Sequence, residues 1–137
     1  MGKLESTCRL LLVDDQESMR LLLAQFIRQD LGAEIALAGT CEAALRLASR
    51  NIYDVILLDL LMPGMGGFEL LGRIRSDSPN KTTPVVVVSS LAGDGVSVER
   101  VKTLGADAVV AKPVRRRALI AAVKAQLRAS ATRPGSV

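Results

Sequence analysis

Apolar positions along the chain follow two different periods. Short runs rich in Leu, Ile and Val predict buried strands, whereas longer segments with apolar residues three and four positions apart predict helices. Strands are expected at residues 8–15, 33–39, 54–59, 84–90 and 106–113. Helices are expected at residues 17–32, 40–51, 67–75, 93–105 and 114–130. This strict alternation predicts an α/β fold with a five-stranded parallel sheet and helices on both of its faces.

The chain of 137 residues has the length of one domain. We expect residues 8–130 to form this domain, residues 1–7 to be disordered, and residues 131–137 to be a flexible tail or the start of a linker. The sequence has no apolar segment of the roughly 20 residues that cross a bilayer, and its polar N-terminus is not a secretion signal. We therefore expect no membrane insertion, and we expect Cys8 and Cys41 to be reduced thiols in the cytoplasm.

Composition excludes two classes of function. The chain contains no histidine, which excludes histidine-based catalysis and most zinc sites. Its aromatic residues are Phe26, Tyr53 and Phe68, too few to form a surface on which nucleic acid bases stack. We therefore expect no direct contact with nucleic acid.

Charge is divided unevenly along the chain. The residues before position 112 include all 14 acidic side chains and 11 basic ones, whereas the residues from 112 onward include seven basic side chains and no acid. The net charge of +4 therefore belongs to the C-terminal segment. Arg117, Lys124 and Arg128 fall on one stripe of the last predicted helix. Two interpretations stay open: a solvated basic face, or a surface for an acidic partner, since cations in a first helical turn oppose the helix dipole.

Four predicted strands end in side chains that carry chemistry. Asp14 and Asp15 end the first strand, Asp59 the third, Ser89 the fourth and Lys112 the fifth. Because the carboxyl ends of parallel strands meet at one edge of a sheet, we expect these residues to lie together. Clustered carboxylates repel one another, and Mg²⁺, which prefers oxygen ligands, relieves that repulsion. Asp59 is then placed to attack a phosphoryl group and form an acyl phosphate, a transfer that needs positioning and charge neutralisation more than a general base.

Each of these residues also has an ordinary explanation when it is taken alone. Asp14 or Asp15 suits the N-cap of the following helix, and one of them could do both jobs. Ser89 alone reads as a strand-end hydroxyl, and Lys112 alone as a solvated charge. The combination, with every group at a strand end, favours a site over these separate explanations.

The stretches "LLVDD", "ILLDLLMPGMGG", "PVVVVSS" and "AKP" together resemble the receiver domain of bacterial two-component response regulators, over about residues 8–128. The resemblance implies a flavodoxin-like doubly wound fold with strand order 2-1-3-4-5, and a signalling switch rather than an enzyme. It implies that Asp59 is the phosphoacceptor. It also implies that Asp14, Asp15 and Asp59 bind Mg²⁺, with Asp15 the more direct ligand of the acidic pair.

Further roles follow from the same resemblance. The backbone carbonyl of Leu61 corresponds to another metal ligand, Ser89 to the switch hydroxyl, and Lys112 to the lysine that pairs with the phosphoryl group. The Lys112–Pro113 bond is expected to be cis. The implied phosphodonor is a histidine kinase or a histidine phosphotransfer protein. An output protein or a second copy of the chain is expected to bind the face near residues 90–128.

The chain departs from the family pattern at positions that affect switching. Many members carry an aromatic residue three positions before the lysine, where this chain has Val109, so a rotating aromatic side chain is not expected. Leu61 and Leu91, two residues after Asp59 and Ser89, offer no polar group to orient an attacking water. We therefore expect slow loss of the phosphoryl group, over hours rather than seconds.

Three alternatives stay open or are weighed against this interpretation. The sequence ends after the receiver, so the chain is either a single-domain regulator, which we favour slightly, or a fragment of a larger regulator or hybrid kinase. A phosphohydrolase of the haloacid dehalogenase type would need a second Asp where Leu61 stands. A flavodoxin-like cofactor binder would need a hydroxyl-rich phosphate loop, where "DDQES" instead repels phosphate.

Overall fold

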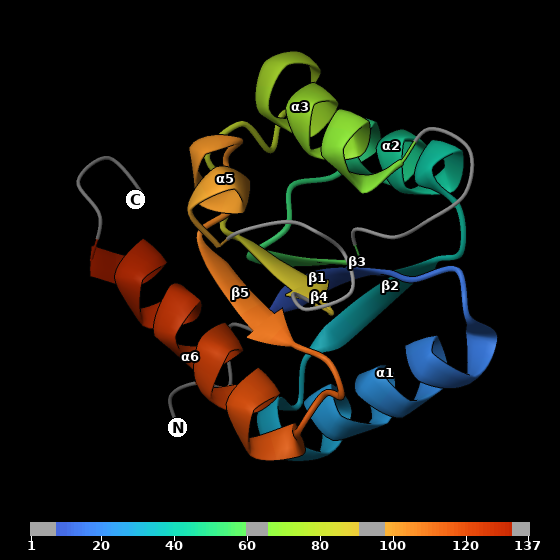
Figure 1. The fold of residues 1–137 in the computed structure, drawn as a ribbon, viewed down its shortest axis with the longest axis vertical. Coiled ribbons are helices and arrows are strands. Elements are labelled where there is room, and N and C mark those ends of the chain that lie inside the picture. Colours follow the sequence, from blue (N-terminus) through green and yellow to red (C-terminus); the bar gives the residue numbers. More distant parts are fainter. Residues whose placement is uncertain (1–7, 60–65, 91–97, 133–137) are drawn as a thin grey trace.

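The computed structural model describes residues 8–59, 66–90 and 98–132. Its strands are β1 (Arg9–Val13), β2 (Glu34–Ala38), β3 (Val55–Asp59), β4 (Val85–Ser89) and β5 (Ala108–Ala111). Its helices are α1 (Glu17–Leu31), α2 (Cys41–Arg50), α3 (Gly67–Asp77), α5 (Val98–Thr103) and α6 (Arg116–Thr132). The predicted alternation of strands and helices is confirmed (Figure 1). At the ends that the structure describes, the observed bounds agree with the predicted ranges within two residues. Helix α6, for example, begins and ends two residues later than the range 114–130.

The strands form one parallel sheet in the order β2-β1-β3-β4-β5, as the family resemblance implies. Helices α1 and α6 cover one face of this sheet, and α2, α3 and α5 cover the other (Figure 1). The fold class predicted from the sequence, a doubly wound α/β domain, is therefore confirmed. None of the described helices is long and apolar enough to cross a membrane.

Side chains of each central strand alternate between the two helical layers, because successive residues of a strand point to opposite faces. The cluster against α2, α3 and α5 includes Leu11, Val13, Ile56, Leu58, Val85 and Val87. The cluster against α1 and α6 includes Leu10, Leu12, Val55, Leu57, Val86 and Val88. Strands β3 and β4 are buried throughout. Their continuous apolar runs thus reflect burial on both faces, as expected for a parallel sheet.

Local signals set the ends of two helices. The Thr40 hydroxyl accepts a hydrogen bond from the Ala43 backbone N–H at 3.0 Å, so Thr40 is the N-cap of α2. Gly32 ends α1 in the left-handed conformation with φ of 62°, which glycine adopts without a steric penalty. The N-cap of α1 is Gln16, without a side-chain cap, so neither Asp14 nor Asp15 takes that position.

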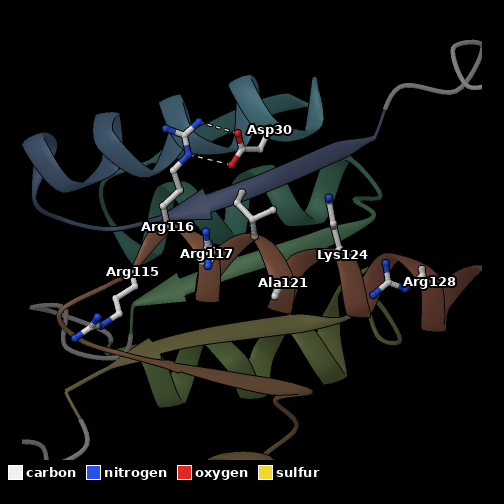
Figure 2. Close-up of a pocket in the computed structure, with 8 residues that line it drawn as sticks. Asp30, Arg115, Arg116, Arg117, Ala121, Lys124 and Arg128 are labelled. Atoms are coloured by element: carbon white, nitrogen blue, oxygen red, sulfur yellow. Dashed lines mark hydrogen bonds and ion pairs between the residues drawn. The ribbon is translucent and has the colours of Figure 1, made fainter.

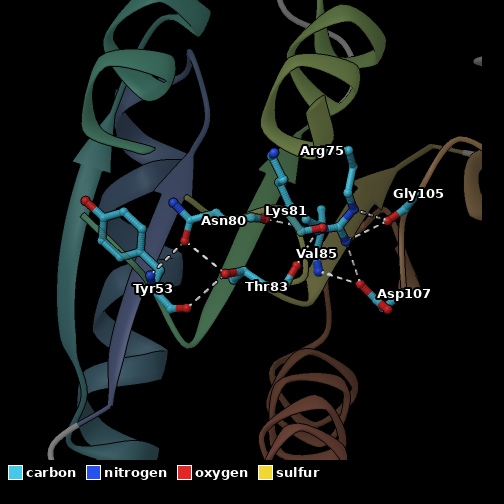
Figure 3. Close-up of polar contacts among 8 residues, drawn as sticks. All are labelled: Tyr53, Arg75, Asn80, Lys81, Thr83, Val85, Gly105 and Asp107. Carbon is cyan, nitrogen blue, oxygen red and sulfur yellow. Dashed lines mark hydrogen bonds and ion pairs between the residues drawn. The ribbon is translucent and has the colours of Figure 1, made fainter. Parts of the chain in front are cut away.

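Arg75 joins three segments at the amino edge of the sheet, where the strands begin (Figure 3). Its guanidinium group donates hydrogen bonds to the Gly105 carbonyl, at 3.0 and 2.7 Å, and to the Asp107 carboxylate at 2.9 Å. It also donates to the Thr83 carbonyl at 2.6 Å. Asp107 in turn accepts the Val85 backbone N–H, so α3, the start of β4 and the segment before β5 are held together.

Asn80 lies fully buried beside Arg75 and connects two further segments. Its amide group donates to the carbonyls of Ala48 and Asn51, both at 2.7 Å, at the end of α2. Its side-chain oxygen accepts from the Tyr53 backbone N–H and the Thr83 hydroxyl, both at 2.9 Å (Figure 3). The connection between α3 and β4 is therefore built around a buried hydrogen-bond centre, opposite the edge where the strands end.

Candidate functional site

The carboxyl ends of four neighbouring strands deliver the predicted site residues. Asp14 follows β1, Asp59 is the last residue of β3, Ser89 is the last residue of β4, and Lys112 follows β5. The register aligns these ends, with Asp59 beside Val88 of β4, and Ser89 beside Ala111 of β5. The prediction that these side chains meet at one edge assumed that the strands are parallel. The observed strand pairing is parallel, so the assumption holds.

Three carboxylates converge at this edge. One oxygen from each of Asp14, Asp15 and Asp59 lies within 4.8 Å of the other two. Asp14 and Asp59 are buried, whereas Asp15 is exposed. The cluster therefore has one carboxylate at the surface beside two buried ones. Oxygen-only ligands at this spacing fit a hard divalent cation such as Mg²⁺, which takes one or two carboxylates and keeps its other positions for water or phosphoryl oxygens.

The electrostatics of Asp14 show why a cation suits this cluster. Burial raises the pKa of the Asp14 carboxyl above its ordinary value, and the charges of Asp59 and Asp15 raise it further. A hydrogen bond from the Gln16 backbone N–H, at 2.9 Å, and the charge of Lys112 act in the opposite direction. The Asp14 carboxylate is therefore incompletely compensated by the protein's own groups, and a bound cation would complete that compensation.

Lys112 is the cation that the protein itself brings to Asp59. Its Nζ atom lies 3.2 Å from Asp59 Oδ1, and the Asp59 side chain is only 4% exposed. The Lys112 backbone N–H donates to the Ser89 carbonyl at 2.9 Å, which ties the end of β5 to the end of β4. The Lys112–Pro113 bond is cis, as the family resemblance implies. Asp59 thus lies close both to two other carboxylates and to an ammonium group.

Ser89 is buried at the end of β4, beside the strand that carries Asp59. Leu61, whose carbonyl was expected to bind the metal, and Leu91 both lie outside the described residues. Their roles stay predictions. Val109 is partly buried and packs against the core under α2, α3 and α5, so an aliphatic side chain occupies the position that is aromatic in many family members.

Two residues near the acidic pair were not identified from the sequence. Arg20, on α1, donates a hydrogen bond from Nη1 to the Asp14 backbone carbonyl at 2.7 Å. A Cβ atom on Gly39 would lie 2.8 Å from that same nitrogen, so the glycine leaves the space that the guanidinium group occupies. The Asp14 backbone N–H donates to the carbonyl of Ala38, the neighbour of Gly39. Nothing in the sequence alone indicates that an arginine in the first turn of a helix and a glycine after a strand are in contact.

The fold is an open parallel sheet that carries three carboxylates, a lysine and a hydroxyl at its carboxyl edge. This arrangement is typical of a class of α/β proteins whose site suits phosphoryl transfer onto a carboxylate. Within that class, residues 10–124 match the response regulator receiver domain family. This match covers most of the chain, so the chain belongs to that family, and the resemblance seen in the sequence is confirmed. Receiver domains are signalling switches of two-component systems.

Known proteins similar to this chain agree with that assignment. Response regulator PleD of Caulobacter vibrioides is 34% identical over 123 residues, which cover 89% of this chain and 26% of PleD. Sensory transduction protein RegX3 of Mycolicibacterium smegmatis is 36% identical, over 88% of this chain and 51% of RegX3. The chain therefore spans about a quarter to a half of these relatives. Chemotaxis response regulator CheY4 of Vibrio cholerae has a similar structure, with a TM-score of 0.80 and 30% identity over 89% of this chain and all of CheY4.

Proposed function

We propose that this chain is a phosphorylation-controlled switch in which Asp59 accepts a phosphoryl group from the phosphohistidine of a kinase or phosphotransfer protein. The observation that carries the proposal is the position of Asp59. Its buried carboxylate is clustered with those of Asp14 and Asp15 and lies 3.2 Å from the Lys112 ammonium group. Family membership supports the same role, and the proposal places the protein in the cytoplasm, where such kinases act.

The transfer uses groups that the chain already holds in place. A carboxylate oxygen of Asp59 forms a bond to phosphorus while the bond from phosphorus to the donor histidine breaks, and the released electron pair returns to the imidazole ring. The Lys112 ammonium group lies where it would offset charge on the phosphoryl oxygens. The Ser89 hydroxyl, at the end of the strand beside β3, would donate a hydrogen bond to one of them. Mg²⁺, held by Asp14, Asp15 and Asp59, would supply further charge neutralisation for the phosphoryl oxygens.

Phosphorylation would change contacts at two strand ends. The new dianion favours arrangements in which Ser89 and Lys112 bind it, and these residues end β4 and precede α6. A pre-existing equilibrium would shift toward those arrangements, altering the face near residues 90–128 that an output protein or a second copy would bind. The aliphatic Val109 leaves Ser89 and Lys112 as the groups that transmit this change.

A small-molecule phosphodonor tests the proposal directly. The purified chain, incubated with acetyl phosphate and Mg²⁺, should gain the mass of one phosphoryl group, and chelation of Mg²⁺ should prevent the gain. Asp59→Asn should gain none, whereas Asp77→Asn, a matched change at an exposed residue, should behave like the unmodified chain. Equal phosphorylation of Asp59→Asn would refute the assignment of the phosphoacceptor.

The same preparation tests the absence of enzymatic turnover and the predicted lifetime. We expect no release of product from generic phosphate esters, which a phosphohydrolase of the haloacid dehalogenase type would hydrolyse. We also expect the phosphorylated chain to persist for hours after the donor is removed. A lifetime of seconds would contradict the inference drawn from Leu61 and Leu91 without touching the role of Asp59.

The proposal applies both to a receiver that stands alone and to a receiver that is part of a longer protein. The chain matches only part of PleD and RegX3, so a stand-alone receiver and a receiver within a larger regulator or hybrid kinase both fit. The complete gene distinguishes them, because a larger protein would encode an output or kinase module in the same reading frame.

A further inference from the structure

A groove of about 800 Å³ is lined by residues at the end of α1 and along α6. It is open to solvent along α6 (Figure 2). Its lining comprises Asp30 of α1 and, from the segment at α6, Arg115, Arg116, Arg117, Ile120, Ala121, Lys124 and Arg128. Five cations and one acid therefore line a single depression, so it concentrates a charge equal to the chain's whole net charge of +4.

The single acid of the groove is already paired. Arg116 donates two hydrogen bonds to the Asp30 carboxylate, at 2.7 and 3.0 Å (Figure 2). Its guanidinium group also lies 5.0 Å from the centre of the Phe26 ring. These hydrogen bonds lower the pKa of Asp30, which stays ionised. Arg116 and Asp30 thus join α1 to α6 and form one wall of the groove. The charges of the remaining cations are not cancelled by this pair.

The remaining cations form a stripe along α6. Arg117, Lys124 and Arg128 recur at i, i+7 and i+11, and Ala121 lies between the first two (Figure 2). Arg117 and Lys124 are exposed and form no ion pair among the residues that the structure describes. The stripe is about 16 Å long at 1.5 Å per helical residue. Small Ala121 and mostly buried Ile120 give it an apolar floor between the charges.

We propose that this groove docks an acidic, amphipathic segment of a partner protein, whose carboxylates pair with Arg117, Lys124 and Arg128 while its apolar side chains pack on Ala121 and Ile120. Charge complementarity selects an anionic partner. The apolar floor favours a polypeptide over nucleic acid, because a phosphate backbone offers no apolar side chains. No aromatic side chain lines the groove for base stacking. The groove shares residues 115–128 with the face proposed above to bind an output protein, but the contacts proposed here do not require phosphorylation of Asp59.

The test uses a fluorescent synthetic peptide of about 12 residues, the helical length that matches the stripe, with Glu and Leu at helical spacing. Fluorescence anisotropy should show saturable binding to the unphosphorylated chain, and a Glu→Gln version of the peptide should bind at least about tenfold more weakly. Arg117→Glu combined with Lys124→Glu should weaken binding of the acidic peptide by at least about tenfold.

A charge-matched control separates the groove from the overall charge. Arg46 and Arg50 are exposed at helical spacing on α2, on the other face of the sheet. Their double change to Glu alters the net charge equally and should weaken binding by less than about twofold. Circular dichroism must show both double variants folded, and Arg117→Gln with Lys124→Gln replaces the charge-reversal variant if it is not.

Several outcomes would overturn the docking proposal. They are equal loss of binding in the two double variants, no saturable binding below about 1 mM peptide, or tighter binding of a single-stranded oligonucleotide of equal charge. Self-association of the chain that the Arg117 and Lys124 changes abolish would assign the groove to a second copy instead. Asp59→Asn should bind the peptide normally, so failure of the phosphorylation proposal and failure of the docking proposal are distinguishable.

Discussion

Gly39 leaves the space in which the Arg20 guanidinium group reaches the backbone of the acidic pair. The hydrogen bond from Arg20 to the Asp14 carbonyl holds the peptide group between Asp14 and Asp15. It therefore helps to position the backbone of Asp15, whose carboxylate is exposed. Neither residue bears on phosphoryl chemistry directly. Their effect is to hold the carboxylates at the spacing that suits a cation.

Gly39→Ala tests this arrangement. The added methyl group would lie 2.8 Å from Arg20 Nη1, so the flexible arginine side chain should move and lose its bond to Asp14. We expect a loss of about 1 kcal/mol in the free energy of unfolding. Arg20→Ala should cost a similar amount, and the double variant little more than either, because both changes remove one contact.

Urea unfolding measures these differences, and Gly72→Ala is the control. A Cβ atom at Gly72, within α3, meets no other atom within 4 Å, so this change should stabilise the chain by about 0.5–1 kcal/mol through helix propensity. Additive losses for Gly39→Ala and Arg20→Ala would show that the glycine and the arginine act separately.

At the scale of elements, Asn80 and Arg75 hold together segments that the core alone does not join. Asn80 binds the end of α2 and the approach to β3, while Arg75 binds α3 to the segments that precede β4 and β5. These contacts lie at the amino edge of the sheet. They keep the strand starts in register, and that register determines where the strand ends, with their carboxylates, are placed.

Asn80→Ala should therefore be strongly destabilising. The change leaves the carbonyls of Ala48 and Asn51 and the Tyr53 N–H without the partner that the fully buried Asn80 side chain provides. We expect a loss of about 2–4 kcal/mol, since each buried polar group left unpaired costs about 1–3 kcal/mol. Thermal and urea unfolding give the value.

Asn51→Ala is the matched control for Asn80. Its side chain is only half-buried and donates one hydrogen bond, to the Leu47 carbonyl at 3.2 Å. The loss should be about 1 kcal/mol or less. A comparable loss at both asparagines would mean that the hydrogen-bond centre at Asn80 contributes no more than an ordinary surface contact.

At the scale of the whole molecule, the carboxylate site depends on the complete sheet. Its members come from β1, β3, β4 and β5, which pack into two apolar clusters on opposite faces. Unfolding any of these strands would disperse the cluster. A cation that binds the folded chain should therefore stabilise the whole domain by mass action, not only the loops around the site.

Mg²⁺ at about ten times its dissociation constant should raise the free energy of unfolding by about 1.4 kcal/mol. In the presence of a metal chelator at neutral pH, the free energy of unfolding of Asp14→Asn should be about 1 kcal/mol greater than that of the unmodified chain. The reason is that the change removes one charge from a partly buried cluster of three carboxylates. Asparagine also keeps an oxygen to accept the Gln16 N–H. Mg²⁺ should then stabilise this variant little, since an anionic ligand is gone.

Asp15→Asn provides the comparison, since its carboxylate is exposed. It should change stability in chelator less than Asp14→Asn does, while also reducing the effect of Mg²⁺. Thermal unfolding of the unmodified chain and both variants, with and without Mg²⁺, gives these values. Equal stabilisation by Mg²⁺ of the unmodified chain and both variants would show that the cation binds elsewhere.

The local sequence pattern was sufficient to predict the elements and the site's main residues. Strand periodicity predicts where β1, β3, β4 and β5 end, and parallel pairing then brings Asp14, Asp59, Ser89 and Lys112 to one edge. Arg20, Gly39 and Asn80 were missed because their residue types are ordinary in helices and turns. Their importance comes from partners that residue type does not reveal.

The amino-acid sequence by itself determined the alternation of strands and helices, the doubly wound fold and the strand-end chemistry, because these follow from local periodicity and from the geometry of parallel sheets. Only the tertiary structure decided which distant groups meet. Arg116 and Asp30 are 86 residues apart, and their pairing depends on how α6 crosses α1 over the core. That packing concentrates the C-terminal cations in one groove. Counting charges along the sequence does not reveal this arrangement in space.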